Sequence, residues 1–114
     1  MSGAPKMATD PATVAFIAEQ LQGAGPVTTR KMFGEYAVYA GAKVVALICD
    51  NQLFVKPTAA AVAMLPDADM APPYPGAKPH IQADALLDDP DTLVALILAV
   101  ERDLPQPKPK KPKR

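Results

Sequence analysis

Tryptophan is absent from this sequence of 114 residues, and cysteine and histidine occur once each, as Cys49 and His80. A single cysteine cannot close an intramolecular disulfide, and a single histidine cannot build the His-rich ligand sets typical of zinc. Unpaired cysteine is typical of reducing compartments. We therefore expect a cytoplasmic protein that binds no metal ion and no cofactor.

Long apolar stretches are missing as well. The N-terminal MSGAPKMATDPATV lacks the apolar core of a secretory signal. No run in the chain approaches the roughly 18 apolar residues that cross a membrane. The sequence therefore predicts a soluble, unexported protein without a membrane partner.

Side chains that would have to cooperate in catalysis are not grouped along the chain. Cys49 follows apolar residues and has no neighbouring base, so we interpret it as a small buried hydrophobe. His80 lies in a proline-rich segment, and no nucleophile can be assigned to it. Gly34 and Gly41 fall between predicted strands, which argues against a phosphate-binding loop. We predict no catalytic residues, no enzyme activity and no small-molecule substrate.

The aspartates gather around prolines and predicted helix starts. In such positions a carboxylate accepts the free amide hydrogens of a first helical turn. The main group is Asp84, Asp88, Asp89 and Asp91. A site for a hard metal ion is the alternative interpretation, although the ordered ligand spacing of such sites is missing.

The residues that are present favour one aliphatic domain. Hydrophobic residues make up 49% of the chain, but only three are Phe and three are Tyr. A chain of this length buries roughly two thirds of its unfolded surface, which suffices for one core. We divide the chain into a loose leader at 1–8, a domain at 9–104 and a disordered Lys/Pro-rich tail at 105–114.

The spacing of apolar residues predicts an α+β fold of two layers, an antiparallel meander sheet packed by helices. Helices are expected at 11–22, 59–65 and 90–104, the first and last after Asp-Pro pairs. Strands are expected at 30–33, 36–40, 44–49, 53–56 and, as an edge strand, near 78–82. The segment 44–49 lacks clean alternation, so we expect a central strand covered on both faces.

The C-terminal helix carries more apolar residues than one stripe requires. Val94 and Leu98 widen a stripe formed by Leu93, Leu96, Ile97, Val100 and Leu104. The extra flank is covered either by the same core or by a second copy of the chain. We predict a homodimer, and sedimentation of a 12 kDa monomer would contradict this.

The zero net charge conceals a division along the chain. Five basic residues and no acid follow Leu104, which leaves seven basic and twelve acidic residues before it. A body of this charge does not attract phosphate as a whole. The candidate contacts to nucleic acid or to a partner are Arg30, Lys31, Lys43, Lys56, Lys78, Lys108, Lys110, Lys111, Lys113 and Arg114. Tyr36, Tyr39 and Tyr74 would suit stacking on bases, whereas the alternative is that the charges keep sheet edges from pairing.

Three runs carry a family resemblance: MFGEY at 32–36, LICDNQLFVK at 47–56 and YPGAK at 74–78. From about residue 14 to 100 the chain resembles the N-terminal domain of the TfoX/Sxy family of competence regulators. The resemblance implies an antiparallel sheet with helices packed on it, a role in transcription, and no catalytic residues. Such regulators commonly add a C-terminal helical domain, and we expect a stand-alone N-terminal domain here.

Two hypotheses about function follow. The first is a cytoplasmic regulatory protein of TfoX type that contacts the transcription machinery or DNA. In this hypothesis the sheet is the docking surface, and the tail contacts phosphates without reading sequence. The second is a dimeric protein-interaction module whose basic tail is only solubilising.

Overall fold

A six-stranded antiparallel sheet with strand order β1-β2-β3-β4-β6-β5 forms one layer of the protein. The computed structural model describes residues 9–32 and 35–105. The strands are β1 (Val27–Met32), β2 (Glu35–Ala40), β3 (Lys43–Cys49), β4 (Gln52–Val55), β5 (Met70–Ala71) and β6 (His80–Gln82). The helices are α1 (Pro11–Gln20), α2 (Ala59–Met64) and α3 (Pro90–Asp103), with short 3-10 helices η1 (Gln22–Ala24) and η2 (Asp84–Asp88). The predicted α+β fold with N- and C-terminal helices is confirmed.

The central strands form a meander because short turns connect them. Asp50 and Asn51 have positive φ angles of 53° and 61°, the conformation that a two-residue hairpin turn between β3 and β4 requires. Gly41, with φ of 62°, serves the turn between β2 and β3. The pairing of β2 with β3 shifts register between Val38 and Tyr39.

Two of the three helices begin with the predicted capping hydrogen bond to a side chain. The side chain of Asp89 accepts a hydrogen bond from the Thr92 amide at 3.4 Å, and the side chain of Thr58 accepts one from the Ala61 amide at 3.3 Å. Asp10 precedes α1 but makes no capping bond with its side chain. Its amide instead donates to Asn51 Oδ1 at 2.8 Å, which ties the start of α1 to the β3–β4 turn.

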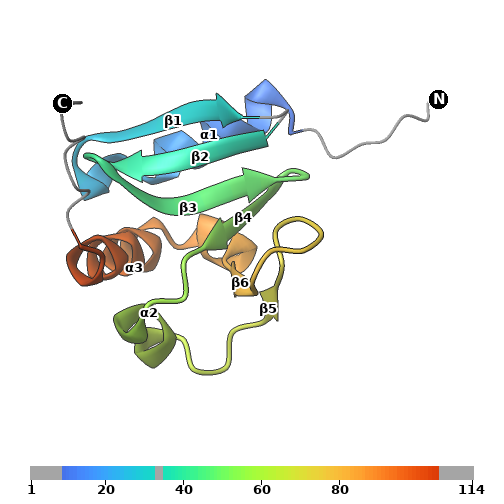
Figure 1. Ribbon diagram of the computed structural model, residues 1–114. Coiled ribbons are helices and arrows are strands. Elements are labelled where there is room, and N and C mark those ends of the chain that lie inside the picture. Colours follow the sequence, from blue (N-terminus) through green and yellow to red (C-terminus); the bar gives the residue numbers. More distant parts are fainter. Residues whose placement is uncertain (1–8, 33–34, 106–114) are drawn as a thin grey trace, which may run out of the picture.

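One face of the sheet packs against the helices and forms the core. The fully buried side chains of this core include Val38, Ile48, Leu53 and Ile81 from the sheet and Leu96 from α3. In Figure 1, α1 lies behind β1 and β2. The expectation that residues 44–49 form a strand covered on both faces is wrong for the second face, because the helices supply buried residues to one face only.

The apolar width of α3 is satisfied mostly within the domain. A Cβ built on Gly23 would lie 3.3 Å from Val94 Cγ2, so η1 packs closely on this flank. Leu98, at 36% exposed, is the residue of the wide stripe that faces outward. The homodimer therefore stays a prediction: of the two residues that prompted it, Val94 is covered within the chain and Leu98 is not.

The proline-rich region departs furthest from the expectations. β6 is not an edge strand, because it pairs with β4 on one side and with β5 on the other. The edge on this side is the two-residue strand β5, which the sequence pattern did not indicate. η2 was also not expected; the side chain of Asp84, at its start, accepts the Leu53 amide at 2.8 Å and so fixes it to β4.

Candidate interaction surface

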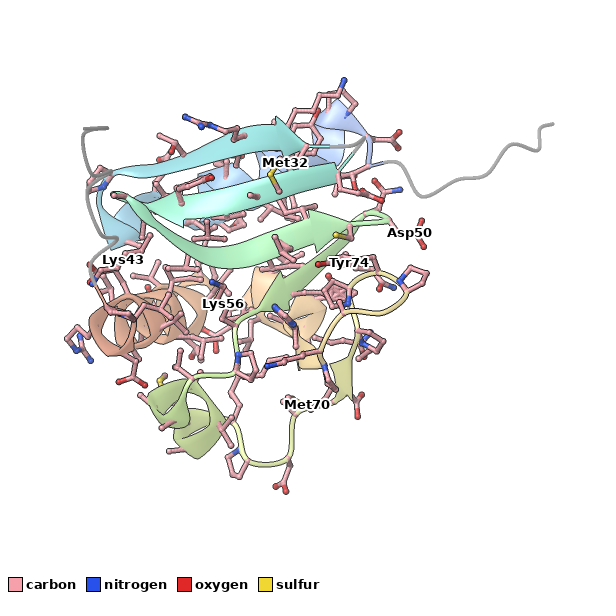
Figure 2. The ribbon with its side chains drawn as sticks, in the orientation of Figure 1. Met32, Lys43, Asp50, Lys56, Met70 and Tyr74 are labelled. Atoms are coloured by element: carbon pink, nitrogen blue, oxygen red, sulfur yellow. The ribbon has the colours of Figure 1, made fainter. Side chains whose placement is uncertain are left out.

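The sheet face opposite the helices lies outside the helix-covered core. Paired residues of neighbouring strands point to the same side of a sheet, so the register assigns every side chain to one face or the other. We call this side the open face, defined by Thr28, Arg30, Met32, Glu35, Ala37, Tyr39, Val44, Leu47, Cys49, Gln52, Phe54, Ala71, His80 and Gln82. Met32 lies on the face turned toward the viewer in Figure 2.

The centre of the open face is apolar. Ala37, Cys49 and Phe54 are buried there, while Leu47, Tyr39 and Val44 are half-buried and Met32 is 40% exposed. Strands that serve only a core present polar residues on their outer side. Of the large apolar side chains on this face, Met32 is the one that is exposed.

A hollow lies at one end of the open face. It has a volume of about 310 Å³ and is lined by Asp50, Gln52, Phe54, Pro72, Pro73, Tyr74 and Pro75. Pro73 is buried against the sheet, whereas the Tyr74 side chain is 50% exposed. Figure 2 shows Tyr74 and Asp50 at the same end of the β3–β4 hairpin. The proline-rich loop thus adds an aromatic wall to the rim of the open face, and the β3–β4 turn adds a carboxylate.

The predicted basic residues do not form one patch. Arg30 lies on the open face with its guanidinium carbon 5.4 Å from the centre of the Tyr39 ring, within the range of a cation–π interaction. Lys56 follows β4 and lines a hollow with Val44, so it borders the same face. Lys31 is exposed on β1 but points to the opposite side.

Lys43 and Lys78 have other surroundings. Lys43 is only 9% exposed; its Nζ lies 3.3 Å from Glu101 Oε2 and donates to the Glu101 carbonyl oxygen at 2.8 Å. This interaction joins β3 to the end of α3 and leaves Lys43 unsuited to a phosphate. Lys78 is exposed in the proline-rich loop. The remaining candidates lie outside the described residues: Lys108, Lys110, Lys111, Lys113 and Arg114.

Of the three tyrosines considered for stacking, two belong to this side of the molecule. Tyr39 lies on the open face and Tyr74 on its rim, while Tyr36 packs partly buried against the core. A sequence signal for the open face did exist. The aromatic and apolar residues of β2 and β4 alternate with the core residues, but both sets are hydrophobic and periodicity alone cannot separate them.

Cys49 is buried, as predicted; it lies on the open face and is held as a neutral thiol. Burial, with smaller contributions from the nearby carboxylates Glu35 and Asp50, raises the pKa of Cys49 to about 11. Glu35 Oε1 accepts hydrogen bonds from the Thr9 hydroxyl and from the Asp50 amide. A thiol in this environment is a poor nucleophile.

Metal binding and membrane insertion find no support in the described part of the chain. Within residues 9–32 and 35–105, no group of three or more His, Cys, Asp or Glu residues is placed to hold a metal ion. Two of the four aspartates considered as a metal site have separate structural contacts, Asp84 with the Leu53 amide and Asp89 with the Thr92 amide. None of the helices in these residues is long and apolar enough to span a bilayer.

The domain thus has one helix-covered face and one open face, which is apolar at its centre and carries charged side chains. Comparison with known proteins identifies its family. The TfoX N-terminal domain matches residues 19–102, and the chain belongs to this family. An uncharacterised 12.7 kDa protein in the trpE 5′ region of Spirochaeta aurantia is 40% identical over 110 residues, covering 94% of this chain and 93% of that protein. Membership in this family supports the interpretation of the chain as a regulatory module related to competence, and the family is not known for enzymatic activity.

Proposed function

We propose that this protein is a non-enzymatic regulatory module of the TfoX N-terminal-domain type that acts in the cytoplasm by binding another protein through its open face. The observation that carries the proposal is the division of the sheet into two faces. The helices bury their apolar residues on one face only, yet Tyr39, Val44, Leu47 and Phe54 make the other face apolar as well.

Membership in the TfoX N-terminal domain family supports the regulatory part of the proposal. The partner on this basis belongs to the transcription machinery, and the protein serves as a coregulator rather than as a reader of DNA sequence. The charge of the body supports a protein partner over DNA, because residues 1–104 carry seven basic side chains against twelve acidic ones.

A nucleic-acid contact is the second candidate, favoured by one observation. Arg30 stacks over Tyr39 on the open face, and aromatic rings beside basic side chains bind single-stranded nucleic acid through stacking and charge. Such binding would weaken steeply with salt.

The test uses matched substitutions of exposed side chains. Tyr74→Glu and Met32→Glu place charge at the open face, where the two side chains are 50% and 40% exposed. Phe16→Glu on α1 and Met64→Glu on α2 are the controls, at 47% and 39% exposed. The tagged protein and these variants are returned to the native host, and cross-linked complexes are isolated with and without nuclease.

A protein partner that resists nuclease, is lost with the open-face variants and is retained by the controls would support the proposal. Complexes that disappear with nuclease would establish the nucleic-acid contact instead. If the cross-linked species is a second copy of the chain, the protein is the dimeric interaction module, and sedimentation equilibrium of the same variants would show whether the open face forms the dimer. Equal binding by all four variants would overturn the assignment of the open face.

A further inference from the structure

The two edges of the sheet are built differently. The β5 edge has two residues and is followed directly by Pro72 and Pro73. Short strands and prolines are common means of preventing an edge from pairing with another chain. The opposite edge is β1, with six residues, and Figure 1 shows it as the outermost strand at the top of the view.

β1 is neither short nor followed by proline, and its protection against pairing with like strands is limited to the two charged residues Arg30 and Lys31. It contains no proline, and it pairs with β2 without a register shift from Val27 opposite Ala40 to Met32 opposite Glu35. Among the described residues no strand pairs with its outer side. Its backbone therefore presents a straight row of amide and carbonyl groups that can accept an added strand.

Two adjacent basic side chains mark this edge. Arg30 points to the open face and Lys31 to the opposite side, and both are exposed. The ion pair between Lys43 and Glu101 is the only one in the described residues, so neither Arg30 nor Lys31 has an acidic partner there. Two unpaired positive charges on one edge favour an incoming strand with acids on both of its faces.

A second copy of β1 fits this edge poorly. Two antiparallel copies related by a two-fold axis pair most extensively in registers centred on Arg30 or on Thr29. In the first register Arg30 faces Arg30 of the other copy directly, and in the second the two lie diagonally across the strands. Both arrangements bring like charges together on one side of the sheet, which destabilises the pairing.

We infer that the β1 edge binds an extended acidic segment of a partner protein as a seventh, antiparallel strand, with two consecutive Asp or Glu residues opposite Arg30 and Lys31. Backbone hydrogen bonds supply the affinity, and the two charge pairs set the register. The inference rests on the proposed function, since the added strand would belong to the partner that covers the adjoining open face.

The probe is a fluorescently labelled peptide with the core Ile-Glu-Glu-Thr-Thr-Val, whose order places both glutamates opposite the basic pair in antiparallel register. A peptide with Lys-Lys in place of Glu-Glu is its matched control. A third peptide carries N-methyl groups on alternate amides and so cannot complete the strand hydrogen bonds. Binding to the full chain is followed by anisotropy, and amide chemical shifts locate the contact.

Reversing the charges of Arg30 and Lys31 is expected to reverse the preference between the two peptides. The wild-type protein binds the Glu-Glu peptide, and R30E/K31E lowers the affinity about tenfold or more, since two attractive pairs become repulsive. The same variant gains affinity for the Lys-Lys peptide. N-methylation abolishes binding, and the shifts centre on residues 27–32. Lys78→Glu, a charge reversal in the proline-rich loop, leaves both affinities unchanged.

Other outcomes would overturn the inference. Failure of the Glu-Glu peptide to bind, insensitivity to N-methylation, or shifts centred away from β1 would each do so. If R30E/K31E instead loses affinity for duplex DNA and the peptide does not bind, the pair contacts phosphate. Failure at the edge with retained sensitivity of the partner to Tyr74→Glu would leave the proposed function intact, whereas loss of both would remove the two together.

Discussion

The two faces of the sheet are made by the same strands but differ in burial. Ile48 and Leu47 are neighbours on β3; Ile48 is fully buried beneath the helices, while Leu47 is half-buried on the open face. The core is built from fully buried positions such as that of Ile48. Apolar residues in half-buried positions such as that of Leu47 add less to stability, and the proposed function assigns them to binding.

The sharpest test of this difference is to shorten the two neighbours in turn. Ile48→Ala removes apolar volume from a fully buried site and should lower the free energy of unfolding by about 2–5 kcal/mol. Leu47→Ala should cost about 1 kcal/mol, because the open face is partly solvated before the change. Urea unfolding measures both values. Equal losses would mean that the open face is part of the core.

A second pair of substitutions compares lysines on the two sides. Lys43→Met removes a nearly buried ammonium that bonds to the carbonyl and carboxylate of Glu101, and it should lower stability by about 1.5 kcal/mol. Lys56→Met, on the open side, should change stability by less than about 0.5 kcal/mol. Thermal unfolding at low and high salt provides the comparison. A larger effect for Lys56 would contradict the assignment of Lys43 as the structural lysine.

The smallest effect concerns Cys49 and pH. The folded-state pKa of Cys49 is raised to about 11 from an unfolded value near 9.0, so folding favours the protonated thiol. Its contribution to stability is complete below pH 9 and is lost as the pH rises toward 11. Between about pH 8 and pH 10 the wild-type protein should lose about 1 kcal/mol more than Cys49→Ala does.

The difference in stability between the wild-type protein and Cys49→Ala isolates the effect of the thiol from that of tyrosine and lysine groups that titrate in the same pH range. Parallel pH profiles would show that burial does not hold the thiol neutral. Alkylation of native Cys49 at about pH 8 should also be slow, and rapid modification would point to the same conclusion.

Much of the fold could be predicted because the local signals agree with one another. The Asp-Pro pairs located α1 and α3, and the Asp-Asn turn located the β3–β4 hairpin. The proline-rich region was harder. β5 has two residues and β6 three, too few for alternation to appear, and their order in the sheet depends on long-range pairing that local patterns do not contain.

The candidate site was only partly predictable, since charge type does not fix charge position. Arg30 and Lys31 are adjacent in sequence, yet strand alternation sends them to opposite sides. Lys43 was predicted to belong with them, but tertiary packing places it in an ion pair with Glu101. The apolar open face was concealed because a hydrophobic residue on the outer side of a strand gives the same pattern as one on the inner side.

The end of α3 has a consequence for anything joined to this fold. Leu104 and Pro105 line a hollow of about 280 Å³ together with Val44 and Lys56, so the main chain leaves α3 at the border of the open face. A group tethered after Pro105 is therefore held at high effective concentration beside that face, in the millimolar range for a short linker. A weak ligand placed there would compete with free partner, and an affinity tag fused at that end would do the same.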